Sequence, residues 1–423
     1  MSNLLKTKIS ECNFEVFAFW CYILGVAFTA LGPVVHYTTW GLTLAALVYG
    51  RLRYGKPVFI LPCGKDSRYI FYILMLFLLW TMFAHVFLMD SFYVWGKGAS
   101  IPLEFILGLC FAIRLLRTAR DRYLFGMAVV AVNAFFALDV MPRECFVILG
   151  FNHALNNGNA VALYGVLLMP FLCCFALWHF RRIYVQFLLC VISALTVFLS
   201  FSSGGWLGAL FEVIPFIFFA LRQHKLSLRL ILPSLIVIMV LLATGDYITN
   251  HRILNRFQLE LQQDSAYNDM EKLTTNRYYI WKMTALMIKA HPITGWGRDT
   301  FDIEFKKYYD RYGKQLGAPT DEIFIEPHSM YFAWAYAGGF PSLILFLAAY
   351  LLSAIKSFRG AGKEDEYGIP WHLICLLLFI GLAVYGTNGD VFEARRDMGA
   401  IFWAAWGLLL VIDDPLRSRK RIN

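Results

Sequence analysis

The sequence predicts an all-α fold: a polytopic bundle of about twelve transmembrane helices with one large, mostly helical loop outside the membrane. Three observations lead to this prediction. Apolar residues make up 59% of the 423 residues and charged residues only 16%, whereas about a quarter of a soluble domain is charged. The apolar residues gather in runs long enough to cross a hydrocarbon core of roughly 30 Å. The Lys and Arg residues lie mainly in short clusters between these runs, as membrane topology requires.

Each apolar run is interpreted as one helical span, because a helix pairs its backbone N–H and C=O groups within the segment itself. Some runs are short, and we expect these to tilt or to re-enter the membrane. The predicted spans lie near residues 15–32, 36–50, 70–88, 99–116, 123–140, 159–179, 183–201, 205–221, 230–247, 329–355, 369–387 and 398–413.

The basic residues orient this bundle with both termini on the cytoplasmic side. In that orientation, 23 Lys and Arg residues fall in inner segments. The short outer loops hold only Lys97, Arg143, Arg395 and Arg396. The positive-inside rule predicts such a bias. The formal net charge of +9 is therefore a signal of topology, and we expect no nucleic-acid partner.

The chain divides into three predicted parts. Residues 1–246 hold nine spans, residues 247–328 form the large outer segment, and residues 329–423 hold three spans and a cytoplasmic tail. The outer segment carries 11 basic residues that are roughly balanced by acidic ones, so it is no polybasic lipid clamp. Because it is the long polar stretch of the chain, we expect the reacting groups there.

Two helices are predicted inside the outer segment. Residues 277–290 contain neither glycine nor proline, and His291–Pro292 ends this helix because a residue before proline leaves the helical region. A second, amphipathic helix is predicted over Phe301–Tyr312. Four residues of the first helix share one face at helical spacing: Arg277, Trp281, Thr284 and Ile288.

His328 closes the outer segment, directly before the next apolar helix. A positive charge is disfavoured near a helix N-terminus, which tends to keep an imidazole neutral and able to accept a proton. A single histidine is more often structural than catalytic, so spacing alone leaves both roles open.

Asparagines precede the span at 159–179, among them Asn157 and Asn159. They either cap the helix or bind sugar hydroxyls. The Ser/Gly-rich stretch around Ser203 predicts a tight turn between two spans.

Two acidic residues, Glu104 and Glu212, fall inside predicted spans, where an ionisable group is a functional hypothesis by default. The nine cysteines lie mostly inside the apolar runs and are interpreted as small buried residues. We find no metal-ligand pattern, so neither a metal nor another cofactor is predicted.

Several motifs resemble those of one family. The stretch RYYIWKMTALMIKAHPITGWG, from Arg277 to Gly297, is similar to the signature of the O-antigen ligase and O-antigen polymerase family of polytopic glycosyltransferases. The segment HSMYFAWAYAGG, which begins at His328, resembles another family motif. Weaker similarities are NGN, which ends at Asn159, and SFSSGGWLG, which contains Ser203. They occur in the family's order, and the twelve-span layout is similar too.

The resemblance implies that a glycan moves from an undecaprenyl-diphosphate carrier to an acceptor hydroxyl at the outer face of the bacterial inner membrane. A lipid A-core sugar is the acceptor that we expect. The expected partners are this donor, the glycan or protein acceptor, and membrane lipids. The implied reaction is metal-independent and inverts the anomeric carbon. His328 would be the base, and Arg277 would bind the diphosphate, because a guanidinium matches phosphate oxygens bidentately.

One position departs from the family pattern. The family commonly has an arginine where this chain has Ser203, and that arginine is thought to hold the diphosphate together with the one that matches Arg277. Four cations are candidates to replace it: Lys282, Arg298, Arg395 and Arg396. The other expected substrate-binding residues are Ser203 itself, Asn157, Asn159 and Trp281.

Two alternatives stay open at this point. A polymerase that joins repeat units, or a protein O-oligosaccharyltransferase, would use the same residues. A multi-pass transporter is an alternative of another class. We see no inverted repeat and few intramembrane charges, which disfavours transport.

Overall fold

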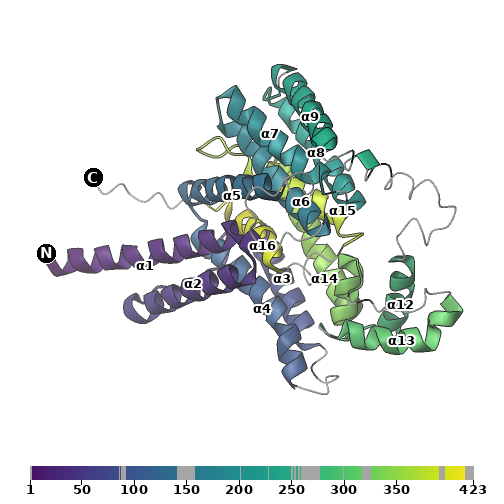
Figure 1. Cartoon of the computed structure of the whole chain (residues 1–423). Helices are drawn as coiled ribbons and strands as arrows, with labels where there is room; N and C mark the ends of the chain where they lie inside the picture. The colour runs from purple at the N-terminus through teal and green to yellow at the C-terminus, as the bar shows by residue number, and fades with distance from the viewer. Residues whose placement is uncertain are drawn as a thin grey trace.

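The computed structural model of the protein describes residues 2–84, 86, 92–140, 158–200, 202–226, 228–248, 251, 254–255, 258, 277–298, 300–316, 324, 326–389 and 396–414. This part of the chain is helical and contains no β-strand, which confirms the predicted all-α class (Figure 1). A helix lies at each of the twelve predicted positions. These helices are α1 (Ser2–Ala27), α2 (Pro33–Tyr54), α3 (Lys65–Phe83), α4 (Phe92–Leu115), α5 (Ala119–Val140), α6 (Gly158–Cys174), α7 (Ile183–Phe198), α8 (Ser203–Arg222), α9 (Leu228–Ile248), α14 (Met330–Gly360), α15 (Trp371–Tyr385) and α16 (Arg396–Val411).

Several of these helices have the length and composition of membrane spans. In the described part of the chain, five stretches qualify: α3, residues 98–115 of α4, residues 159–179, α8 and α14. Shorter apolar helices cover residues 13–27, α7, α15 and residues 399–411. The protein is therefore a membrane protein. The total of twelve spans, the orientation and the outer position of residues 247–328 stay predictions.

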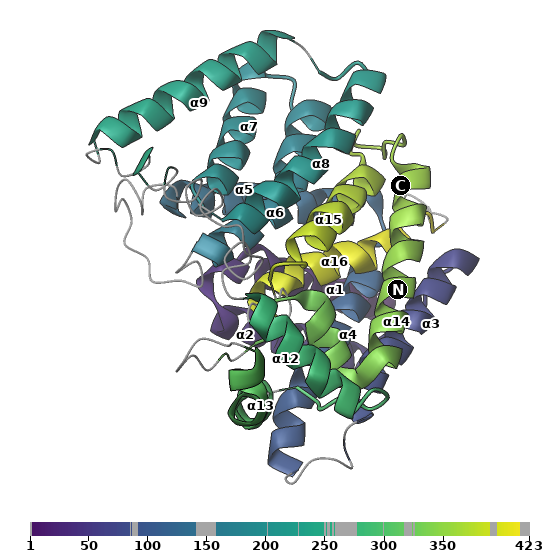
Figure 2. The same ribbon diagram turned by 90° about the vertical axis from the view of Figure 1, so that its right-hand side faces the viewer.

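Three helices, α6, α15 and α16, form the centre of the bundle, and their side chains are almost all buried. Helix α16 packs against α3, α4 and α15, while α15 packs against α6, α8 and α14. Figure 2 shows α9 along the edge of the bundle, beside α7. Because α15 packs against α6, α8 and α14, it holds these three helices in fixed positions relative to one another.

Close helix contact in the centre depends on Gly407 of α16. A Cβ atom at this position would lie 2.5 Å from the Cβ of Ala112 and 2.7 Å from the carbonyl oxygen of Leu109, both on α4. Inside a membrane no hydrophobic force drives helices together, so their association depends on close van der Waals packing. Small residues allow this packing, because they let the two backbones approach each other. The α4–α16 contact therefore relies on the missing side chain of Gly407.

The outer segment contributes two helices, α12 (Arg277–Ala290) and α13 (Phe301–Leu316). Both predicted helices are confirmed, and α13 continues four residues beyond the expected end because Leu316 still packs on the apolar side. Figures 1 and 2 show both helices at one end of the bundle, with α12 beside the start of α14. Their buried side chains share a second core with α14, formed by Ile280, Met283, Met287, Ile288, Phe301, Phe305, Ala335 and Tyr336.

Gly407→Val is expected to loosen the α4–α16 contact. Overpacking a close helix contact costs about 1–3 kcal/mol, so the midpoint of thermal unfolding in detergent should fall clearly. Gly41→Val on α2 is the matched control, because nothing lies within 4 Å of a Cβ atom built at Gly41. Equal unfolding midpoints for the two variants would contradict the packing argument.

Candidate functional site

His328 lies just before α14 in a constrained backbone conformation. Its φ angle is +49°, in the left-handed region that residues other than glycine rarely adopt. Nδ1 of the ring lies 3.1 Å from Oε1 of Glu326, and the two side chains are 28% and 19% exposed. Phe324 meets the ring edge-on, with a centroid separation of 6.1 Å. Outliers of this kind cluster at functional sites, so the Glu326–His328 pair is a candidate for chemistry.

The residues after His328 fasten it to the end of α15. Ser329 precedes the first helical residue of α14. The backbone N–H of Met330 donates to the carbonyl oxygen of Gly386 at 2.8 Å. The hydroxyl of Tyr331 donates to the carbonyl oxygen of Ala383, also at 2.8 Å. His328 is therefore held where α15 finishes, at a helix start, as the sequence predicted.

Arg277 is the first residue of α12. Burial lowers the pKa of its guanidinium, while Tyr385 and Glu326 act electrostatically in the opposite direction. Both groups are therefore within electrostatic range of the cation. Within the described residues, Arg277 makes no ion pair within 4.0 Å. Glu326 thus interacts electrostatically with both residues that the sequence singled out, the guanidinium of Arg277 and the ring of His328.

The starts of α6 and α8 complete this cluster. The hydroxyl of Tyr385 donates to the carbonyl oxygen of Asn159 at 2.9 Å, and the hydroxyl of Ser202 donates to Oδ1 of Asn159 at 3.2 Å. Ser203 is the exposed first residue of α8. We call the region of Asn159, Ser203, Arg277, His328 and Tyr385 the site end of the bundle.

Four helices begin at the site end: α6, α8, α12 and α14. The first turn of a helix leaves backbone N–H groups without intrahelical partners and carries a partial positive charge. Helix N-termini therefore favour bound anions. Together with Arg277, this arrangement favours an anionic group, and the Glu326–His328 pair places a proton acceptor beside it.

The other predicted site residues lie in different surroundings. The Trp281 ring stacks on Phe332 of α14 at a centroid separation of 6.2 Å. The Arg298 guanidinium is buried and lies 4.0 Å from the ring centroid of Trp334, in a cation–π contact inside the bundle. Lys282 lies over the ring of Tyr278 at 4.1 Å. Their roles in substrate binding stay predictions.

Three predicted residues fall partly or wholly outside the part of the chain that the structure describes. Asn157 and Arg395 lie outside it. Arg396 is the first residue of α16, and its side chain also lies outside the described part.

Sequence reasoning missed Glu326 and Tyr385. Glu326 stands two residues before His328, so this spacing was an available signal for a carboxylate–imidazole pair. No sequence pattern predicts the hydrogen bond from Tyr385 to Asn159, because the two residues come together only when α15 packs against α6.

The two intramembrane acids differ in their environment. Glu104 lies 2.9 Å from Nε2 of His36 and accepts a hydrogen bond from Tyr37 at 3.2 Å, which accounts for it structurally. Glu212 is fully buried, and neither of its carboxylate oxygens has a hydrogen-bond partner among the described residues. It lies against Gly381, where a Cβ atom would collide with Oε1 of Glu212.

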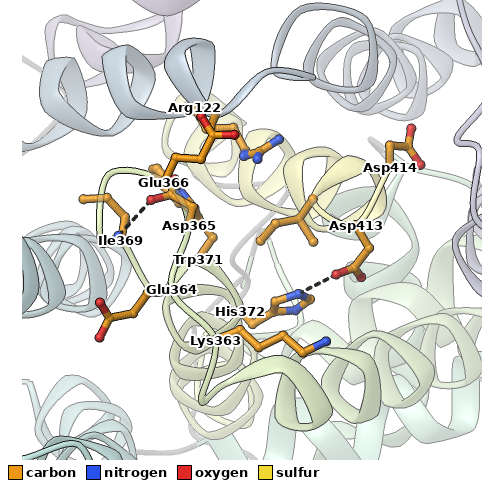
Figure 3. Close-up of a pocket in the computed structure, with 12 residues that line it drawn as sticks. Arg122, Lys363, Glu364, Asp365, Glu366, Ile369, Trp371, His372, Asp413 and Asp414 are labelled. Atoms are coloured by element: carbon orange, nitrogen blue, oxygen red, sulfur yellow. Dashed lines mark hydrogen bonds and ion pairs between the residues drawn. The ribbon is translucent and has the colours of Figure 1, made fainter. Parts of the chain in front are cut away.

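A polar cavity of about 330 Å³ opens at the opposite end of α15 (Figure 3). His372 approaches Asp413 at 3.1 Å, and hydrogen bonds from His372 and Lys356 lower the pKa of the Asp413 carboxyl. Arg122 and Glu366 also line the cavity. With a rise of 1.5 Å per residue, α15 separates the cavity from the site end by roughly 21 Å. The cavity is therefore no part of the candidate site.

Comparisons with known proteins point to one family. Residues 188–347 match the family profile described as O-antigen ligase, and this stretch contains Arg277, Glu326 and His328. A protein of Haemophilus influenzae that is described only as uncharacterized is 26% identical over 240 residues. The match covers 53% of this chain and 56% of the relative, so the chain spans little more than half of the relative's length.

Proposed function

Because residues 188–347 belong to the O-antigen ligase family, as the sequence motifs predicted, we propose that the protein transfers a glycan from undecaprenyl diphosphate to an acceptor hydroxyl. The reaction takes place at the outer face of the bacterial inner membrane, with both termini in the cytoplasm and residues 247–328 in the periplasm. The observation that carries the proposal is the Glu326–His328 pair, with Arg277 in electrostatic range of Glu326, at a place where four helices begin.

The donor diphosphate binds at the helix starts of the site end. Arg277 donates in a fork to two phosphate oxygens and stabilises the charge that develops on the leaving group. The N-termini of α6 and α8 add partial positive charge. Arg298, Arg395 and Arg396 are the candidate second cations, because Ser203 contributes only a hydroxyl.

His328 removes the proton of the acceptor hydroxyl. An ionised carboxylate only accepts hydrogen bonds, so Nδ1 of His328 carries the proton that faces Glu326. The second ring nitrogen, Nε2, is then the base. As the acceptor oxygen bonds to the anomeric carbon, the bond from that carbon to the phosphate oxygen breaks. Undecaprenyl diphosphate leaves with the electron pair, the proton rests on Nε2, and the anomeric configuration inverts. The step needs no metal.

The acceptor that we propose is a sugar of the lipid A-core. Asn157, Asn159 and Trp281 are the proposed contacts to sugar hydroxyls and rings. A polymerase or a protein O-oligosaccharyltransferase would use the same chemistry with another acceptor. Product analysis separates the three: a capped lipid A-core, a longer lipid-linked glycan, or a glycosylated protein.

His328→Ala is expected to lower the rate of transfer about 10²–10⁴-fold, the contribution of a general base. The measurement is glycan transfer by the purified protein in proteoliposomes that contain lipid-linked glycan and lipid A-core acceptor. His179→Ala is a control, because the His179 ring contacts the hydroxyl of Tyr123 and the carbonyl oxygen of Tyr367, away from the site end. A full rate for His328→Ala would remove the base from the mechanism.

Arg277→Lys is expected to lose most of the activity, because a point charge cannot reproduce the guanidinium fork. A hydrogen bond to a charged group contributes about 1.5–3 kcal/mol, which corresponds to a loss of roughly 10–150-fold in kcat/KM. Lys289→Arg on the same helix controls for a general effect of the exchange, because Lys289 is exposed in its last turn. A wild-type kcat/KM for Arg277→Lys would argue against bidentate binding of the diphosphate.

Glu326→Ala is expected to lower kcat by about tenfold to a hundredfold, because small misplacements of a catalytic group have effects of this size. Glu326 acts through His328, so the double variant Glu326→Ala/His328→Ala should be no slower than His328→Ala alone. Multiplied losses in the double variant would show instead that Glu326 contributes independently of the ring.

A further inference from the structure

Helix α14 is interrupted inside its apolar stretch. Gly338 has φ −137° and ψ 22°, and Gly339 has φ +70° and ψ −172°, both outside the helical region. Pro341 follows two residues after Gly339 and has no N–H group. In an unbroken helix the carbonyl of each residue accepts from the N–H four residues later. The carbonyl of Ala337 would therefore meet the proline nitrogen, which has nothing to donate.

Residues 291–297, which follow α12, supply the missing partners. The N–H of Trp296 donates to the carbonyl oxygen of Tyr336 at 2.8 Å, and the N–H of Gly297 donates to that of Ala337 at 3.1 Å. In the other direction, the N–H of Phe340 donates to the carbonyl oxygen of Pro292 at 2.8 Å. Three backbone hydrogen bonds thus join this segment to both sides of the break.

Other contacts hold the same joint. The indole N–H of Trp80 on α3 donates to the carbonyl oxygen of Gly338 at 2.8 Å. The indole N–H of Trp296 donates to the carbonyl oxygen of Met287 at 2.7 Å, which ties the segment to the last turn of α12. The hydroxyls of Thr300 and Tyr336 are 2.8 Å apart. The joint therefore includes α3, α12 and α14.

Two glycines make the close backbone approach feasible. Gly295 has φ +65°, and a Cβ atom there would lie 2.5 Å from the carbonyl oxygen of Tyr336. Gly339 has φ +70°, and a Cβ atom there would lie 2.4 Å from the carbonyl oxygen of Ile293. Any side chain would meet rigid backbone at both positions, and the left-handed φ would strain it as well.

We propose that residues 291–297 are a backbone clamp on broken helix α14, and that the clamp sets the position of Arg277 relative to His328. Arg277 begins the helix that leads into the clamp, and His328 lies two residues before the start of the helix that the clamp holds. Most residues of the joint are buried or half-buried, and a buried backbone N–H or C=O group without a partner is costly, so the two helices cannot separate at low cost. Gly295 and Gly339 are positioning residues and touch no substrate.

The clamp gives the HPITGWG motif a structural role, which the pattern alone does not reveal. The positioning part of this inference rests on the proposed function, whereas the clamp itself does not. Hydrogen exchange and transfer kinetics therefore test the two parts separately.

The first experiment is hydrogen exchange, followed by mass spectrometry, on the full chain in nanodiscs without substrate. In the wild type, the amides of Trp296, Gly297 and Phe340 should exchange slowly, although the neighbouring Ile293 side chain is 61% exposed. Gly295→Ala should speed exchange roughly tenfold or more in residues 294–298 and in residues 336–340 together, because each segment pairs the other.

Gly313→Ala on α13 is the matched control, because a Cβ atom there makes only ordinary contacts at 3.4 Å and beyond. Trp80→Phe is the milder variant should Gly295→Ala fail to fold: it removes one hydrogen bond, keeps an aromatic ring, and should speed exchange in residues 336–340 to a smaller extent. Fast exchange in the wild type, or faster exchange in Gly295→Ala on one side of the joint alone, would overturn the clamp.

The second experiment measures transfer by Gly295→Ala. A misplaced pair of reacting groups should lower kcat roughly tenfold or more and change the KM for the donor much less. An unchanged kcat in a variant whose clamp exchanges faster would overturn the positioning role and leave the clamp intact. Absence of transfer by the wild type with each acceptor would overturn the proposed function, while the exchange data would still decide on the clamp.

Discussion

The constraint on which this structure depends is the pairing of backbone polar groups in an apolar environment. A helix meets it everywhere except in its first and last turns and at breaks. The polar chemistry of this chain is found at these places. The candidate site lies where α6, α8, α12 and α14 begin and α15 finishes, and residues 291–297 cover the break in α14. The unpaired N–H groups of the helix starts favour an anion, so the same constraint that shapes the fold favours an anionic group at the site end.

Charge at the site end is arranged around one carboxylate. Glu326 lies beside His328 and in electrostatic range of Arg277, whose charged form it stabilises. A guanidinium that already made a tight ion pair would have to give it up before binding a phosphate. Arg277 has only longer-range electrostatic interactions with Glu326 and Tyr385 in the described structure. The arrangement thus keeps the fork accessible to a ligand while His328 retains its orienting partner.

Much of the fold followed from sequence patterns, because helix positions depend on local apolar periodicity and on stop signals. Helix α12 has the expected bounds, since His291–Pro292 ends it. Helix α13 runs past its predicted end because Leu316 packs on the second core, a contact that periodicity does not show. The place of His328 before a helix start was also predictable. The neighbours of Arg277 were not: Tyr385 is 108 residues away, and only the packing of α15 brings it close. The glycines of HPITGWG predicted a turn. No sequence pattern predicted that this turn packs against the helix break at Gly338 and Gly339.

Ser203 raises the question of how donor binding works with one described cation at the site end. A helix N-terminus contributes about 0.3–1 kcal/mol to binding a negative charge, whereas a hydrogen bond to a charged group contributes about 1.5–3 kcal/mol. The start of α8, where Ser203 stands, therefore recovers only part of what an arginine would add there. The tail of the proposed carrier adds little to this, because it already lies in the apolar bilayer before the donor binds. On these magnitudes, Arg277 makes the largest described contribution to binding the diphosphate of the proposed donor. In the proposed mechanism Arg277 also stabilises the charge on the leaving group, which places its effect on kcat as well as on binding.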